Sequence, residues 1–138
     1  MKSIPRQLII GLSLAGLLWS SCGTANAGYL ETYQQPITAP DLALIDIDGN
    51  LHQLEDFYGN IVLVNFWASW CTPCIREIPS MHRLAQALQG KPFRIIAVNV
   101  AESKNVARRF SEQLGGGTTI LLDTDRAAFK RWQAIVLP

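Results

Sequence analysis

The sequence predicts an α/β fold with a parallel or mixed sheet. Residues 61–67 are almost continuously apolar, which is typical of a strand buried on both faces. Residues 71–89 follow with apolar side chains at helical spacing, and a second apolar run covers 93–100. A strand, a helix and a strand in this order predict a right-handed parallel crossover. A chain of 138 residues, 49 % hydrophobic and 17 % charged, is typical of one globular domain.

An N-terminal hairpin is expected to precede the crossover. Residues 41–47 alternate partly between apolar and polar side chains, and 51–54 form a second short run. The segment 48–50 between them carries the Asp-Gly pair of a tight turn. Residues 28–40 contain two prolines and little periodicity, so we expect a linker there and a domain over 41–138.

The remaining elements follow the crossover. Pro79 lies inside the predicted 71–89 helix and is expected to kink it, and Gly90 is expected to end it. The later elements are, in order, a helix over 104–114, a break at Gly115-Gly116-Gly117, a short strand over 118–122 and a short helix over 126–132.

Residues 1–27 are typical of an export signal. Two basic residues precede an apolar run at 8–19, and 25–27 is the small-x-small pattern that a signal peptidase accepts. The apolar run is shorter than the ~20 residues that a membrane-spanning helix needs. Two alternatives to cleavage are lipidation at Cys22, whose surroundings loosely resemble a lipobox, and retention of 1–22 as an anchor. Each alternative predicts a periplasmic or other extracytoplasmic domain.

The charge balance excludes some classes of function. The formal net charge is +1, with 12 basic and 11 acidic residues. Removal of the leader takes away Lys2 and Arg6 and leaves 10 against 11, a net charge of −1. Without a basic patch, no nucleic acid is expected as a partner. No heme, flavin, nucleotide or metal motif is found, so no cofactor is expected.

Trp70-Cys71-Thr72-Pro73-Cys74 is the stretch that carries chemistry. It follows the predicted strand directly and opens the predicted helix. The partial positive charge and the unpaired N–H groups at a helix N-terminus favour a thiolate. Two intervening residues let the sulfurs meet within one turn, so the pair can cycle between dithiol and disulfide. Zinc would need about four ligands, and the two histidines lie at no characteristic spacing, so a redox role is favoured.

Several stretches match a known family. They are Asp48-Gly49, the run Asn65-Phe66-Trp67-Ala68-Ser69 with the motif after it, Glu77, Pro79, and Ile135-Val136-Leu137-Pro138. Together they resemble the thioredoxin-like superfamily, and within it the exported TlpA/ResA/DsbE-type thiol–disulfide oxidoreductases. The resemblance implies that Cys71 is the exposed nucleophile and Cys74 the resolving thiol. It also implies that Trp70 and Pro73 shape the site and tune its reduction potential.

Three further residues take their expected roles from this resemblance. Asn65 stands where cytoplasmic thioredoxins carry a buried aspartate that accepts a proton from the second cysteine. Glu77 is therefore the candidate to accept that proton. The alternative for Glu77 is an exposed helical glutamate without a role in the reaction, and the alternative for Asn65 is a polar strand residue without one. Pro138 matches the cis-proline that faces the cysteines. In the family two strands and a helix follow it, so we expect a truncated domain, an open edge on the 61–67 strand and low stability.

The resemblance implies that the protein is a thiol–disulfide oxidoreductase. The leading expectation is that it reduces disulfides in exported proteins, and cytochrome c maturation is one process of this kind. The implied partners are the thiols and disulfides of exported proteins and an upstream membrane electron donor, and we expect a monomer. Two alternatives are open: a DsbA-like oxidant, and a non-catalytic remnant or binding module.

Overall fold

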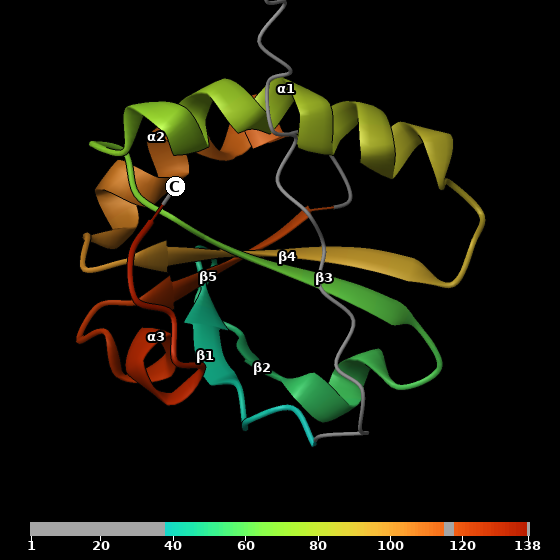
Figure 1. The fold of residues 1–138 in the computed structure, drawn as a ribbon, viewed down its shortest axis with the longest axis horizontal. Coiled ribbons are helices and arrows are strands. Elements are labelled where there is room, and N and C mark those ends of the chain that lie inside the picture. Colours follow the sequence, from blue (N-terminus) through green and yellow to red (C-terminus); the bar gives the residue numbers. More distant parts are fainter. Residues whose placement is uncertain (1–37, 115–117, 138) are drawn as a thin grey trace, which may run out of the picture. The chain divides into compact units, whose positions relative to one another are not determined.

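The computed structural model describes residues 38–114 and 118–137, which form a five-stranded sheet flanked by helices (Figure 1). The elements are, in chain order, β1 (Ala43–Asp46), β2 (Leu51–Gln53), the 3-10 turn η1 (Leu54–Phe57), β3 (Ile61–Trp67), α1 (Thr72–Ala87), β4 (Phe93–Val100), α2 (Lys104–Leu114), β5 (Thr118–Asp123) and α3 (Ala127–Arg131). The strand order is β2-β1-β5-β4-β3. The predicted α/β class, hairpin and crossover are confirmed.

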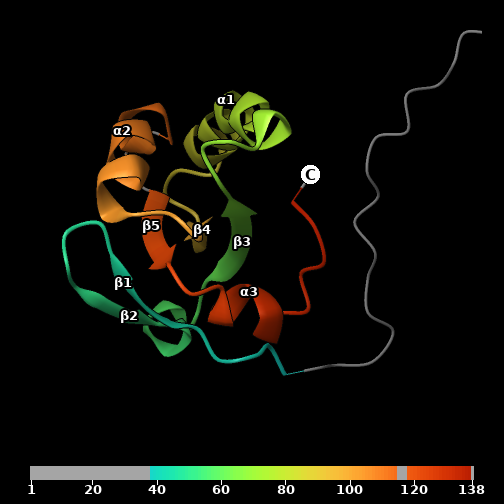
Figure 2. The ribbon, with the colours of Figure 1, turned by 90° about the vertical axis from the view of Figure 1, so that its left-hand side faces the viewer.

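The parallel part of the sheet places the motif. Strands β3 and β4 pair in parallel from Ile61 opposite Phe93 to Trp67 opposite Asn99, and β4 pairs in parallel with β5. Helices α1 and α2 lie on one face of this sheet and α3 lies on the other (Figure 2). The carboxyl ends of β3 and β4 therefore meet at one edge of the sheet, where the segment after β3 carries the cysteines.

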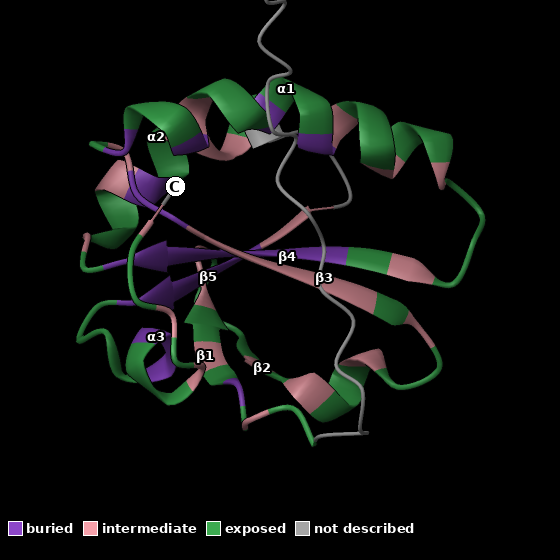
Figure 3. Ribbon diagram, in the orientation of Figure 1, coloured by how far each residue is buried: buried purple, intermediate pink, exposed green. Residues whose placement is uncertain are grey.

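Strands β4 and β5, each of which has a neighbouring strand on both sides, form the centre of the core (Figure 3). In β4 the six residues 95–100 are buried in succession, and in β5 so are the last four, 120–123. Strands with a neighbour on each side and helices on both faces read as unbroken apolar runs. The core on the α1 and α2 face is built around Trp67, Ile95 and Ile120, and that on the α3 face around Ile96, Val98 and Leu121.

The expectation that 61–67 is buried on both faces is wrong. Only Trp67 is fully buried in β3, while Val62 through Phe66 are half-buried. The physical reason is the strand order: β3 is the last strand of the sheet that the described residues form, so one of its edges has no neighbouring strand there. An apolar run therefore identified the strand but not its position in the sheet.

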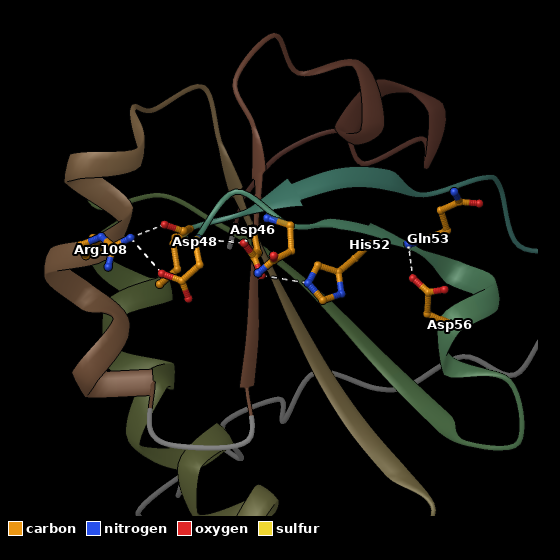
Figure 4. Close-up of polar contacts among 8 residues, drawn as sticks. Asp46, Asp48, His52, Gln53, Asp56 and Arg108 are labelled. Carbon is orange, nitrogen blue, oxygen red and sulfur yellow. Dashed lines mark hydrogen bonds and ion pairs between the residues drawn. The ribbon is translucent and has the colours of Figure 1, made fainter.

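The carboxylate of Asp46 adds side-chain hydrogen bonds to the turn of the hairpin (Figure 4). Asp46 Oδ1 accepts the N–H groups of Asp48, at 2.7 Å, and Asn50, at 2.9 Å. Its Oδ2 accepts Nδ2 of Asn50 at 3.1 Å and faces Nε2 of His52 at 2.9 Å. Burial alone would raise the pKa of Asp46, but these hydrogen bonds, led by that of His52, hold the pKa well below its usual range. The carboxylate thus adds to the backbone hydrogen bonds of the turn and stabilises the hairpin.

The same hairpin is tied to α2. The Arg108 guanidinium donates to the Asp48 carboxylate at 3.0 Å and to the Ile47 carbonyl oxygen. Beside it, Ile47 packs against the core on the α1 and α2 face. A surface ion pair of this kind contributes little by itself, but the backbone contact fixes where α2 meets the hairpin.

Most predicted boundaries are close to those observed. The two long strands are observed as predicted, β5 is one residue longer, and α3 covers 127–131 instead of 126–132. Helix α1 is continuous through Pro79, and Gly90 adopts a φ of +79° just beyond it, as a helix-terminating glycine does. In the part of the chain that the structure describes, no helix is long and apolar enough to span a membrane.

Several predictions lie outside the described residues. They concern the leader at 1–27 with Cys22, the linker up to residue 37, the glycine break at 115–117, and Pro138.

Candidate active site

The two cysteines form a disulfide where β3 passes into α1. Their Cα atoms lie 5.3 Å apart, within one helical turn. Cys71 is the N-cap residue of α1, with extended backbone angles, and its Sγ accepts the backbone N–H of Cys74 at 3.3 Å. Pro73 fits the first turn because that position needs no intrahelical donor. The sequence thus places one sulfur on the N-terminus of the helix that carries the other.

The turn before α1 fixes the direction in which Cys71 enters the helix. The Cys71 N–H donates to the Ala68 carbonyl at 3.1 Å, and the Cys71 carbonyl accepts the first helical N–H, from Ile75, at 3.1 Å. The Cys71 sulfur therefore lies where the unpaired N–H groups and the positive end of the helix dipole favour a thiolate.

The expectation that Cys71 is exposed is wrong for the disulfide form. Cys71 is only 4 % exposed and Cys74 only 1 %. Both belong to the apolar core on the α1 and α2 face, and Leu137 from the C-terminal segment packs against that core. Trp70, by contrast, is 67 % exposed. The large side chain next to the disulfide, and not the sulfur itself, forms the accessible surface.

Glu77 and Asn65 lie at different depths. Glu77 is exposed on α1, where its carboxylate meets solvent. Asn65 is half-buried in β3, and its Nδ2 lies 3.0 Å from Met81 Sδ in α1. The structure brings Trp70, Pro73 and both cysteines together at the start of α1, while the proton-handling role of Glu77 stays a prediction.

Ser69 forms a polar cluster beside the motif with Glu102 and Asn99, two residues that the sequence patterns did not single out. Glu102, in the turn after β4, accepts the Ser69 N–H at Oε2, 2.7 Å away, and the Ser69 hydroxyl at Oε1, 2.5 Å away. Its Oε2 also accepts Nδ2 of Asn99 at 2.8 Å. The sequence does contain a signal for Glu102. Parallel strands bring their carboxyl ends together, so an acidic residue just after the apolar run 93–100 lies near the motif that follows the run 61–67.

Two of the hollows on the described part of the molecule lie away from the disulfide, and neither has a cysteine in its wall. One, of about 500 Å³, lies at the end of α1, with His82, Leu88 and Arg94 in its wall. The other, of about 400 Å³, lies beside β3, with Phe57, Val64 and Trp132 in its wall. The surface at the disulfide is instead provided by the start of α1.

Comparison with known proteins agrees with this arrangement. Residues 37–137 match the sequence profile described as "AhpC/TSA family". The chain is 43 % identical over 86 residues to "Thiol-disulfide oxidoreductase ResA" of Geobacillus thermodenitrificans, covering 62 % of this chain and 49 % of that protein. It is 34 % identical over 108 residues to the protein of the same name from Bacillus subtilis, covering 78 % and 60 %. The chain therefore spans about half to three fifths of these relatives.

Solved structures show the same fold. A putative thiol:disulfide interchange protein DsbE from Chlorobium tepidum aligns with a TM-score of 0.64 at 31 % identity, covering 70 % of this chain and 68 % of that one. The thioredoxin domain of a thiol–disulfide oxidoreductase from Bacteroides vulgatus aligns with a TM-score of 0.67 at 25 % identity, covering 78 % and 79 %. The predicted thioredoxin-like fold is confirmed.

Proposed function

Because this chain belongs to the AhpC/TSA family of thioredoxin-like proteins, we propose that it is a thiol–disulfide oxidoreductase. The observation that carries the proposal is the Cys71–Cys74 disulfide, closed within one turn at the N-terminus of α1. The names of its relatives support the reaction class. Family membership alone would not carry it, since function depends on the site.

The reaction proceeds in two exchange steps. The Cys71 thiolate attacks one sulfur of a substrate disulfide, the substrate S–S bond breaks, and the second substrate sulfur leaves as a thiolate that takes a proton from solvent. The Cys74 thiol then loses its proton and attacks Cys71 Sγ, which closes the internal disulfide and releases the other substrate thiol. Two electrons pass from the dithiol to the substrate, and an external dithiol restores the reduced form.

The proposal includes the direction and the place of the reaction. We infer that the protein reduces disulfides of exported proteins, cytochrome c maturation being one such process, and that a membrane donor reduces it in turn. The export-type pattern of residues 1–27 supports an extracytoplasmic location. Mass spectrometry and fractionation of cells that make the protein with its leader test this: cleavage after Ala27, a lipid on Cys22 or an intact leader in the membrane fraction supports export, and an intact chain in the soluble cytoplasmic fraction opposes it.

Reduction of insulin by dithiothreitol tests the reaction. The protein should accelerate it, and Cys71→Ser should abolish the acceleration, while Ser80→Ala on the exposed face of α1 should not change it. Cys74→Ser should accumulate a mixed disulfide, because the resolving thiol is gone. A protein no faster than its Cys71→Ser variant would favour a non-catalytic binding module. A reduction potential near that of strong oxidants, about −120 mV, would favour the oxidant alternative.

A further inference from the structure

We propose that Glu102 is a positioning residue, whose carboxylate holds the turn that delivers Cys71 to the start of α1; this inference rests on the proposed thiol–disulfide exchange. Glu102 does not act on the substrate. It acts through Ser69, which lies 33 positions away in sequence and two residues before Cys71.

The three contacts of Glu102 connect a rigid strand to that turn. Its Oε2 receives both the Ser69 N–H and Asn99 Nδ2, and its Oε1 receives the Ser69 hydroxyl. Hydrogen bonds to an ionised carboxylate are roughly twice as strong as neutral ones. Ser69 is thereby held at two atoms, which fixes both its position and its orientation.

The anchor on the other side is in the core. Asn99 is 0 % exposed, in a strand whose other residues from 95 to 100 are all apolar and buried. It lies directly opposite Trp67, the last residue of β3. Its Nδ2 faces the carboxylate, while its Oδ1 is buried without a hydrogen-bond partner among the described residues. The buried Asn99 amide donates a hydrogen bond to the Glu102 carboxylate, and an apolar residue at this position could not supply that hydrogen bond.

The turn that is held determines the place of Cys71. Ser69 and Trp70 are the two central residues of the turn closed by Cys71 N–H to Ala68 oxygen. Cys71 is at most about 7.6 Å from Ser69 between Cα atoms, since each peptide step spans about 3.8 Å. Trp70 is 67 % exposed, so packing of this side chain provides little alternative restraint. A displacement of Ser69 moves Cys71 away from its cap on Cys74 N–H.

The geometry allows an isosteric test. In Glu102→Gln, an oxygen at the Oε2 position can still accept from Ser69 N–H and from Asn99, and an Nε2 at the Oε1 position can donate to the Ser69 hydroxyl. All three contacts are retained while the charge is lost. Glu102→Ala removes all three contacts together with the charge. Glu112, exposed on α2, provides the matched controls Glu112→Gln and Glu112→Ala.

The first measurement is the kinetics of disulfide reduction. Glu102→Ala should lower kcat about ten- to a hundredfold, since a displacement of about 1 Å can have that effect, with KM changed less than about twofold. Glu102→Gln should stay within about threefold of the unchanged protein. Equal losses in Glu102→Gln and Glu102→Ala would overturn the proposal, because the charge and not the position would then matter. A fall in melting temperature without a change in kcat would also overturn it.

The second measurement does not require the proposed function. The rate at which iodoacetamide alkylates the reduced protein, followed against pH, reports the apparent pKa of the Cys71 thiol. Both variants lose the negative charge, which by itself leaves or lowers the pKa of a nearby thiol. Only Glu102→Ala also lets the sulfur move off the helix N-terminus, so the apparent pKa should be higher in Glu102→Ala than in Glu102→Gln. A shift of the same sign and size in both variants would overturn the proposal. If Glu102→Ala does not fold, Ser69→Ala is measured in its place. It must raise the apparent pKa of the Cys71 thiol, and an unchanged apparent pKa overturns the proposal.

The two measurements separate the two proposals. If the protein reduces no disulfide but the apparent thiol pKa is higher in Glu102→Ala than in Glu102→Gln, the proposed function fails and the positioning role stands. If disulfide reduction is found but the variants do not differ, the positioning role fails alone.

Discussion

Cys71 caps the helix that carries Cys74: its Sγ lies 3.3 Å from the Cys74 backbone nitrogen and accepts that N–H. The contact joins stability to reactivity, because the atom that satisfies an orphan helix donor is also the atom that attacks in the proposed exchange. The positive end of α1 stabilises this sulfur most when it is a thiolate.

Replacement of Cys71 by serine or alanine should separate these two roles. Serine is a good N-cap and alanine is a poor one, so Cys71→Ser should be about 1 kcal/mol more stable than Cys71→Ala. Both should lack reductase activity. Urea unfolding, compared with the reduced parent protein so that no disulfide contributes, measures the difference. Equal stability of the two variants would show that position 71 does not cap α1.

Removal of Leu137 should open the disulfide to reductants. Leu137 is half-buried against the core that contains both cysteines, and Cys71 is only 4 % exposed. Leu137→Ala should therefore accelerate reduction of the disulfide by dithiothreitol severalfold. Alkylation of the released thiols at successive times measures the rate of reduction. The matched control is Val136→Ala, because Val136 is 79 % exposed. An equal acceleration in both variants would assign the effect to loosening of the whole segment.

Glu77 should affect the chemistry more than the stability. Glu77 is exposed on α1, so Glu77→Gln should change the free energy of unfolding by less than about 0.5 kcal/mol. If the carboxylate accepts the proton from Cys74, the release of the mixed disulfide should slow and the pH–rate profile should shift. Rapid-mixing kinetics against pH measures both, with Glu112→Gln as control. An unchanged profile would remove Glu77 from the mechanism.

The carboxylate of Asp46 should make the fold sensitive to acid. Burial raises the pKa of Asp46, but the hydrogen bonds from His52, Asn50 and Asp48 lower it by more than burial raises it. The folded-state pKa therefore lies below the unfolded value of about 3.9. The stabilisation is then complete above that unfolded value and is lost as the pH falls through the folded-state pKa. Asp46→Asn should be less stable at pH 7 and should lose less stability on acidification.

Chemical unfolding at a series of pH values between about 7 and 3 measures this dependence. Asp41→Asn, at an exposed position outside the hairpin, is the charge-matched control. Parallel stability profiles for Asp46→Asn and the parent protein would contradict the assignment.

Much of the fold was predictable because its strongest signals are local. The apolar runs at 61–67 and 93–100 became β3 and β4 with those bounds, and the Asp-Gly pair marked the turn of the hairpin. The cysteine spacing placed both sulfurs within one turn. Periodicity, turn chemistry and a two-residue spacing all operate over a few residues, so a single sequence carries them.

The sequence by itself determined the elements, the crossover and the pairing of the two cysteines within one helical turn, since each depends on neighbours along the chain. Only the tertiary structure decided that Cys71 is buried in the disulfide form and that Glu102 holds Ser69. Burial depends on what the other elements cover, and the partners Glu102 and Ser69 meet only because the parallel register of β3 and β4 aligns the ends of both strands. No local pattern specifies that alignment.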